Sequence, residues 1–164
     1  MKVNRGKEFE AQVEKAFQVI PDVSIDRIHD QTSGYKGSSN ICDYIVYKWP
    51  NQYYIECKSC YGNTLSIHSN NPKHKYGDIT NKQWEGLLEK STIKGVIAGY
   101  FVWFIDHDTT VFVSANGMNS VKLRGEKSLH INKLKSLSES DWSMIPGKKK
   151  RVFFEYDMTE FLTR

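Results

Sequence analysis

The chain has 164 residues, of which 39% are hydrophobic and 13% aromatic, enough for the core of a single compact domain. No run approaches the ~18 apolar residues of a membrane span, and the polar start MKVNRGKEFEAQVEK lacks the apolar stretch of a signal peptide, so we expect a cytoplasmic protein without membrane contact. The net charge is only +4, but residues 118–151 hold nine Lys and Arg against three acids. That segment fits either a polyanionic partner or a solvated basic surface.

The first part of the chain predicts a helix followed by three strands. In order, the expected elements are a helix at 5–20, a strand at 23–29, a polar loop at 30–40, and a hairpin with strands at 41–48 and 53–59 around a turn at 49–52. The helix is expected because its apolar residues fall on one stripe, namely Phe9, Val13, Ala16, Phe17 and Ile20.

The second part predicts a further helix and a buried hairpin. The expected elements are a loop at 61–75, a helix at 80–90, a strand at 96–105, a turn at 106–108, a strand at 110–114, a partly helical stretch at 116–144, an edge strand at 151–156 and a short helix to 162. The second helix opens with the capping box Thr80-Asn-Lys-Gln83. Helices alternating with strands indicate an α/β fold, one domain over residues 1–164 with a central mixed sheet flanked by helices.

The predicted hairpin gathers charged residues on one face. A turn centred between Pro50 and Asn51 places Asp43 opposite Lys58, with Glu56 diagonal to Asp43. Opposed residues and residues two apart share a face of a sheet, and diagonal neighbours lie roughly 7–8 Å apart. Two carboxylates at that spacing can converge on one Mg²⁺, and an adjacent lysine can position a water or stabilise charge on a phosphate.

These three residues therefore suggest metal-assisted phosphodiester hydrolysis. The alternative is an exposed Asp43–Lys58 ion pair with Glu56 in solvent, which contributes under about 1 kcal/mol. A one-residue change of register would put Asp43 and Glu56 on opposite faces and remove the metal hypothesis.

An aspartate followed by Glu-x-Lys on the next strand resembles the PD-(D/E)xK nuclease superfamily. Four further features, spread over residues 4–115, resemble RecU-type and archaeal Holliday junction resolvases. They are the helix opening Arg5-Gly-Lys-Glu-Phe-Glu10, Arg27 with Ser33-Gly34 ahead of Asp43, the strand Tyr54-Ile-Glu-Cys-Lys-Ser59, and Asp78-Ile-Thr-Asn-Lys-Gln83 followed by the apolar strand 99–105.

The resemblance implies a restriction-endonuclease-like core and a Mg²⁺ site at which Mn²⁺ can substitute. It implies metal binding by Asp43, Glu56 and Gln83, with the carbonyl of Cys57 as a further ligand, and catalytic roles for Lys58 and Glu10 beside them. The implied substrate is branched DNA, a four-way junction nicked symmetrically by a homodimer. The expected DNA-binding residues are Arg5, Arg27, Ser33, Lys36, Lys148, Lys149, Lys150 and Arg151.

The chain also departs from the RecU-type pattern. Ile41 and Cys42 stand where those enzymes have two threonines before the aspartate, and the loop at 30–40 is too short for their protruding stalk. These departures indicate a compact variant of the kind that a bacteriophage encodes. They leave open how such a chain recognises a junction.

Several alternatives stay open on the sequence alone. Gln83 can serve only as a helix cap, Glu10 as a solvated helix residue, and the basic run 148–151 as a solvated turn. Apolar residues of the strands at 96–114 or of the first helix could form the dimer interface, although Trp103 and Phe104 are expected in the core. Rival functions are a nuclease for other DNA substrates and a DNA-binding module without catalysis.

The cysteines raise two more alternatives. Cys57 and Cys60 have CxxC spacing, typical of a thiol redox site or half a zinc site. Cys42, His68 and His74 are the nearest further ligands, and no second CxxC or HxxxH pair is present. With three cysteines in all, we expect free thiols.

Overall fold

The computed structural model describes residues 4–29, 40–67 and 79–164. They form a central six-stranded sheet in the spatial order β1-β2-β3-β5-β6-β8. Its strands are β1 Ser24–Arg27, β2 Tyr44–Lys48, β3 Asn51–Cys60, β5 Val96–Phe104, β6 Thr109–Ser114 and β8 Trp142–Met144. Strands β3 and β5 are parallel and the other pairs antiparallel, so the predicted mixed sheet is confirmed.

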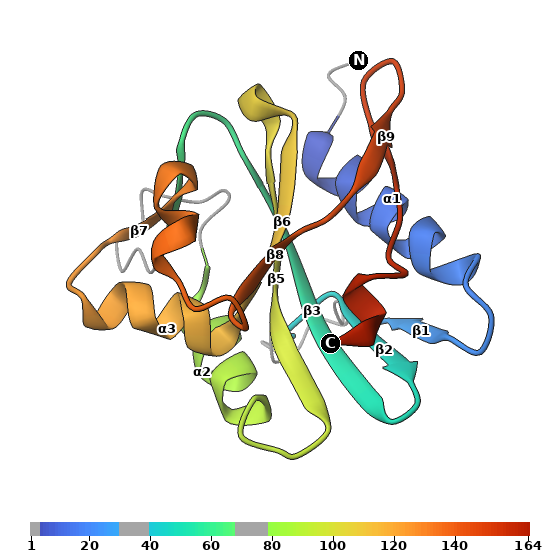
Figure 1. The fold of residues 1–164 in the computed structure, drawn as a ribbon, viewed down its shortest axis with the longest axis horizontal. Helices are drawn as coiled ribbons and strands as arrows, with labels where there is room; N and C mark the ends of the chain where they lie inside the picture. Colours follow the sequence, from blue (N-terminus) through green and yellow to red (C-terminus); the bar gives the residue numbers. More distant parts are fainter. Residues whose placement is uncertain (1–3, 30–39, 68–78) are drawn as a thin grey trace, which may run out of the picture.

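Helices cover both faces of this sheet (Figure 1). Helix α1, Arg5–Gln18, packs on one face together with the C-terminal segment of the chain. Helices α2, Asn81–Lys90, and α3, Ala115–Leu123, pack on the other face. The apolar stripe predicted for the first helix is buried from Phe9 to Phe17, whereas Ile20 lies beyond the end of α1 and is only partly buried. The sheet thus separates two apolar cores.

Strands β5 and β6 form the centre of both cores. Trp103 and Phe104 are buried as predicted, and so are Phe101, Val102 and Val111. Since these side chains lie inside the protomer, they are not available for the dimer interface that the sequence suggested there. Within the described residues, no helix is long and apolar enough to cross a membrane.

The short elements differ most from the predictions. Besides the central sheet, the described residues form two ribbons, β4 Thr64–Ser66 with β7 Ser128–His130 and β9 Gly147–Lys149 with β10 Phe154–Tyr156, and three 3-10 helices, Ile105–His107, Ile131–Ser136 and Phe161–Thr163. The loop at 61–75 therefore contains a strand, and the stretch at 116–144 contains two. The expected edge strand at 151–156 does not join the central sheet, because it pairs with β9.

The β2–β3 hairpin has a tighter turn than predicted, and this changes its register. Lys48 pairs with Asn51, so the turn is Trp49-Pro50 rather than residues 49–52. The observed pairing is offset by two residues from the prediction and, continued past Tyr44, puts Asp43 opposite Glu56 instead of Lys58. An offset of two keeps every side chain on its predicted face. Asp43, Glu56 and Lys58 therefore still share one face.

Candidate active site

A pocket of about 440 Å³ lies where the hairpin meets helices α1 and α2, and we call it the carboxylate pocket. It is lined by Lys7, Glu10, Arg27, Ile28, His29, Asn40, Cys42, Asp43, Glu56, Thr80 and Gln83. Four of the five predicted catalytic residues are in this lining. The fifth, Lys58, reaches it through an ion pair with Glu56.

Asp43 and Glu56 form a close pair of carboxyl groups. The charge of Asp43 raises the pKa of Glu56, and Asp43 Oδ2 accepts the backbone N–H of Cys57 at 2.8 Å. Glu56 is only 4% exposed, although it is an acid. The alternative with Glu56 in solvent is therefore wrong, because the fold buries this carboxyl against a second one.

Burial dominates the electrostatics of the pair. Desolvation, followed by the charge of Asp43, raises the pKa of Glu56 to about 8, and Lys58 opposes the shift. Desolvation also raises the pKa of Asp43, against the N–H of Cys57 and the charge of Lys58. Both shifts reflect mainly the cost of burying a charged carboxylate, so the pair favours a proton, or a cation that offsets its charge.

Two neighbours hold Glu56 in place. Lys58 Nζ lies 2.9 Å from Glu56 Oε1, with a side chain only 13% exposed. Gln83 Nε2 donates to the same oxygen at 2.6 Å. Gln83 Oε1 meanwhile accepts the N–H of Thr80, completing the capping box of α2. Gln83 thus caps the helix and contacts Glu56 in the pocket at the same time, and the cap fixes which way the amide points.

Glu10 enters the pocket from α1. Its carboxylate pairs with Arg27 at 2.6 Å, and Arg27 also approaches Glu14 and stacks over the Tyr44 ring. Burial, followed by the charge of Asp43, raises the pKa of Glu10. Glu10 is therefore part of the acidic cluster rather than a solvated helix residue, and Arg27 lines the pocket while staying partly open to solvent.

The donor set suits a hard cation. Carboxylate oxygens are the ligands that Mg²⁺ prefers, and one or two carboxylates are its usual share from a protein. Within the described ranges, no three His, Cys, Asp or Glu side chains come together as a larger metal cluster. Contacts of Gln83 or of the Cys57 carbonyl with a metal stay predictions.

The cysteines look inert. All three are free thiols, and Cys42 and Cys57 are buried. Burial raises the pKa of Cys42 and of Cys60 to about 12 and that of Cys57 well above its ordinary value. A thiol without thiolate character is a poor nucleophile and a poor metal ligand. These pKa values disfavour both the redox and the zinc alternatives, although His68 and His74 lie outside the described residues.

The structure does not bring the predicted DNA-binding residues together at one place. Arg27 lies at the carboxylate pocket. Arg5, from the start of α1, and Lys149 and Arg151, from near the end of the chain, line one hollow of about 270 Å³ beside Trp103. Lys149 pairs with Asp108 and Lys150 with Glu155, while Lys148 is exposed on the β9–β10 ribbon. Ser33 and Lys36 lie outside the described residues.

The sequence interpretation missed some residues of the pocket. Lys7, one turn before Glu10 on α1, lowers the pKa of Glu10 by its charge. The i, i+3 spacing was the signal that could have placed it there. His29 and Thr80 also line the pocket, and His29 follows two residues after Arg27 just beyond β1.

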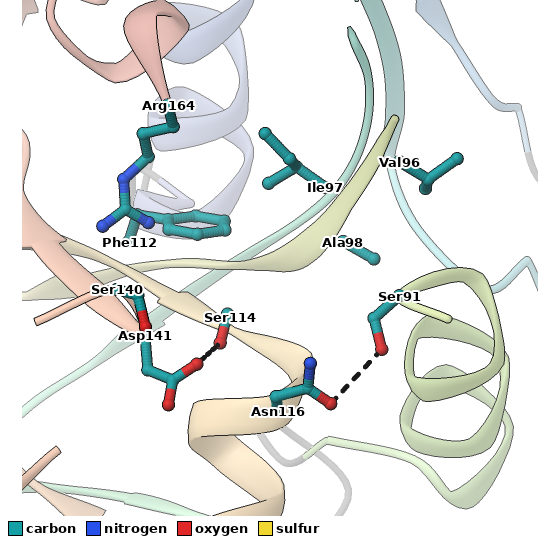
Figure 2. A pocket seen from close by; sticks show the side chains of 10 residues that line it. All are labelled: Ser91, Val96, Ile97, Ala98, Phe112, Ser114, Asn116, Ser140, Asp141 and Arg164. Carbon is teal, nitrogen blue, oxygen red and sulfur yellow. Dashed lines mark hydrogen bonds between the residues drawn. The ribbon is translucent and has the colours of Figure 1, made fainter. Parts of the chain in front are cut away.

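A second cavity, of about 460 Å³, lies elsewhere on the molecule, and Figure 2 shows its lining. Arg164 stacks over the Phe112 ring there, Asp141 accepts a hydrogen bond from Ser114 at 2.6 Å, and Ser91 approaches Asn116 (Figure 2). Asp141 is the one carboxylate among the described lining residues. The carboxylate pocket is therefore the stronger candidate for metal chemistry.

Comparison with protein-family models and with curated proteins finds no match to this chain.

Proposed function

We propose that the protein is a Mg²⁺-dependent endodeoxyribonuclease of the PD-(D/E)xK type that resolves four-way DNA junctions by paired nicks. The observation that carries the proposal is the buried Asp43–Glu56 carboxyl pair with Lys58 beside it on one hairpin face. The mixed sheet flanked by helices agrees with the core that the resemblance implies.

The buried pair lowers stability unless something offsets its charge. Burying a carboxylate is costly unless it is paired or coordinates a metal, and the two raised pKa values reflect that cost. Asp43 and Glu56 would hold the metal, which when bound would supply charge neutralisation at a phosphate and a more acidic water. A site built for stability alone would more simply use apolar residues at these two positions.

The neighbouring groups have separate tasks. Lys58 carries the positive charge next to the pair and can stabilise charge that develops on the phosphate oxygens. Gln83 orients the Glu56 carboxylate through its amide N–H. Arg27 holds Glu10 on the pocket side of α1, which keeps further negative charge near Asp43. Each group is fixed by a regular element, which favours precise positioning.

The junction as substrate is supported by the sequence resemblance over residues 4–115. Paired nicks across a junction of two-fold symmetry require two active sites related by a two-fold axis, and a homodimer supplies them. The hollow formed by Arg5, Lys149 and Arg151 offers positive charge for backbone phosphates.

The test is nicking of a synthetic four-way junction and a sequence-matched linear duplex, with Mg²⁺, Mn²⁺ or EDTA, by wild type, Glu56→Ala and Lys58→Ala. We expect symmetric nicks in the junction with either metal, none in EDTA, and at least a 100-fold loss in both variants. Equal cutting of the duplex would keep the nuclease and remove the junction specificity. Junction binding without any cutting would mean that the protein is a DNA-binding module without catalysis.

A further inference from the structure

Another hollow, of about 490 Å³ and separate from those described above, lies beside the carboxylate pocket, and we call it the β3 groove. It is bounded by the start of α1, the end of β3 and strand β4. Lys58 belongs to its lining and also pairs with Glu56 of the carboxylate pocket. A long ligand that has one of its repeating units bound at the Asp43–Glu56 pair would therefore extend into this groove.

The lining of the groove differs in charge from the pocket. The carboxylate pocket contains Glu10, Asp43 and Glu56, which repel a phosphate backbone unless a cation is present. Among the described residues that line the β3 groove, Lys58 is the one charged side chain, and the polar groups are amides and hydroxyls such as Asn4, Ser59 and Ser66. Hydroxyl and amide groups next to a lysine are common partners of phosphate oxygens.

The groove also carries an exposed aromatic ring. Tyr61 is 65% exposed, directly after β3, in a lining that is otherwise mostly polar. The turn that presents it is fixed, because the N–H of Gly62 donates to Asp106 at 2.6 Å and Asn63 contacts His107. Gly62 adopts the left-handed φ of +72° that this tight turn needs. A ring held in this way exposes a face on which a base can stack without a large ordering cost.

We infer that the β3 groove holds the DNA strand that flanks the cleaved phosphate, locally unpaired at the branch point, with a base stacked on Tyr61. This inference rests on the proposed function and adds a binding site for one strand. Tyr61 follows Lys58 by three residues, roughly 10 Å along a strand, so the stacked base lies within a few nucleotides of the cleaved bond. Every base has a stacking face, so the contact tolerates any sequence.

The experiment measures binding without cleavage. A fluorescein-labelled single strand of twelve deoxythymidines is titrated with protein in EDTA, and binding is followed by anisotropy. The variants are Tyr61→Ala, Tyr61→Phe and, as a matched exposed aromatic far along the hairpin, Trp49→Ala, whose ring is 79% exposed. We expect Tyr61→Ala to weaken binding by about 5- to 150-fold, the range that loss of one stacked base gives. Tyr61→Phe and Trp49→Ala should stay within about twofold of wild type, because stacking needs only the ring.

A second readout places the contact. A single 5-iododeoxyuridine is moved along a junction strand through the nucleotides near the nick, and ultraviolet cross-links are mapped on the protein. We expect a cross-link at Tyr61 from one or two neighbouring positions. Wild-type affinity of Tyr61→Ala together with no cross-link at Tyr61 would overturn the inference while leaving the nuclease intact. If the wild type binds the strand but never cuts the junction, and Tyr61→Ala loses the binding, the result would support the strand site and contradict the catalytic proposal. No binding by a wild type that still nicks the junction would contradict the strand site and leave the catalytic proposal standing.

Discussion

The two faces of strand β3 differ in their chemistry, although each carries fully or almost fully buried side chains. On one face Tyr53 and Ile55 are fully buried against α1 and the C-terminal segment. On the other face Glu56 is almost as buried, yet it contacts Asp43, Lys58 and Gln83 instead of apolar side chains. The first face gains free energy from burial, whereas the second pays a desolvation cost. Such a contrast within one strand indicates that the polar face serves function rather than stability.

The largest expected effect on folding comes from the apolar face. Ile55→Ala should lower the free energy of unfolding by about 2–5 kcal/mol, because it leaves a cavity between the sheet and α1. Val19→Ala, at an exposed position after α1, is the control and should change it by less than about 0.5 kcal/mol. Urea unfolding measures both variants. A loss below 1 kcal/mol at Ile55 would show that this face does not hold the fold.

Removing the buried acid from the polar face should raise the stability of the protein instead of lowering it. Because the folded-state pKa of Glu56 lies near 8, above its ordinary value of 4.5, folding takes up a proton between these values, and stability falls as pH rises through this window. Glu56→Gln removes this loss. In EDTA we expect the variant to unfold at a higher temperature than wild type at pH 8, with the gain shrinking toward pH 4.5. Since one unit of pKa shift corresponds to about 1.4 kcal/mol, the gain at pH 8 is on the order of a few kcal/mol.

Melting curves of wild type, Glu56→Gln and the exposed control Glu139→Gln, from pH 4.5 to pH 8.5, test this expectation. The control should follow the wild type at every pH. A Glu56→Gln variant that melts below the wild type at pH 8 would mean that the ion pair with Lys58 outweighs desolvation.

Gln83 joins the helix cap to the site, and two variants separate these roles. Thr80→Ala removes the side chain that caps α2 and should cost about 1 kcal/mol of stability with cleavage little changed. Gln83→Ala removes part of the cap and the hydrogen bond to Glu56, and should also slow cleavage by about tenfold, the equivalent of one ordinary hydrogen bond. Nicking rates under single-turnover conditions compare the two. Equal cleavage rates in both variants would show that Gln83 acts through the helix cap and not through its hydrogen bond to Glu56.

The smallest effect is expected at the basic hollow. Arg151→Ala should weaken junction binding a few-fold at low salt and reduce the slope of log affinity against log salt by about 1, as for one lost phosphate contact. Lys135→Ala, exposed on the 3-10 helix at Ile131–Ser136, serves as the control. Anisotropy at four salt concentrations gives both slopes. An unchanged slope for Arg151→Ala would remove this hollow from the DNA-binding surface.

The sequence predicted which residues lie together in the carboxylate pocket more accurately than it predicted the strand register and the short elements around them. Alternation along the hairpin placed Asp43, Glu56 and Lys58 on one face even though the register was wrong by two residues, because facing depends only on whether an offset is even or odd. The capping box of Thr80 and Gln83 was readable because its two hydrogen bonds are local. Neither pattern could show that Gln83 also reaches Glu56, since that contact joins elements far apart in the chain.

The short strands were beyond sequence reasoning for a related reason. β4, β7 and β8 have three residues each, too few to show an alternation, and they exist because distant partners pair with them. The pairing of β10 with β9 likewise could not be predicted, because the basic run 148–151, which covers part of β9 and of the turn after it, is typical of a solvated loop. The sequence shows the positive charges of this segment, but it does not show that they lie next to Arg5 in the fold.

The most direct test of the central claim is titration of the metal-free protein with Mg²⁺ by calorimetry, at pH 6 and pH 8, for wild type, Asp43→Asn and Glu56→Gln. We expect the wild type to bind Mg²⁺ more tightly at pH 8 than at pH 6 and to release protons on binding, because the raised pKa of Glu56 leaves a proton for the metal to displace. Both variants should lose this binding. Mg²⁺ binding that is unchanged in both variants, or absent from the wild type, would contradict the claim that the Asp43–Glu56 pair is a metal site.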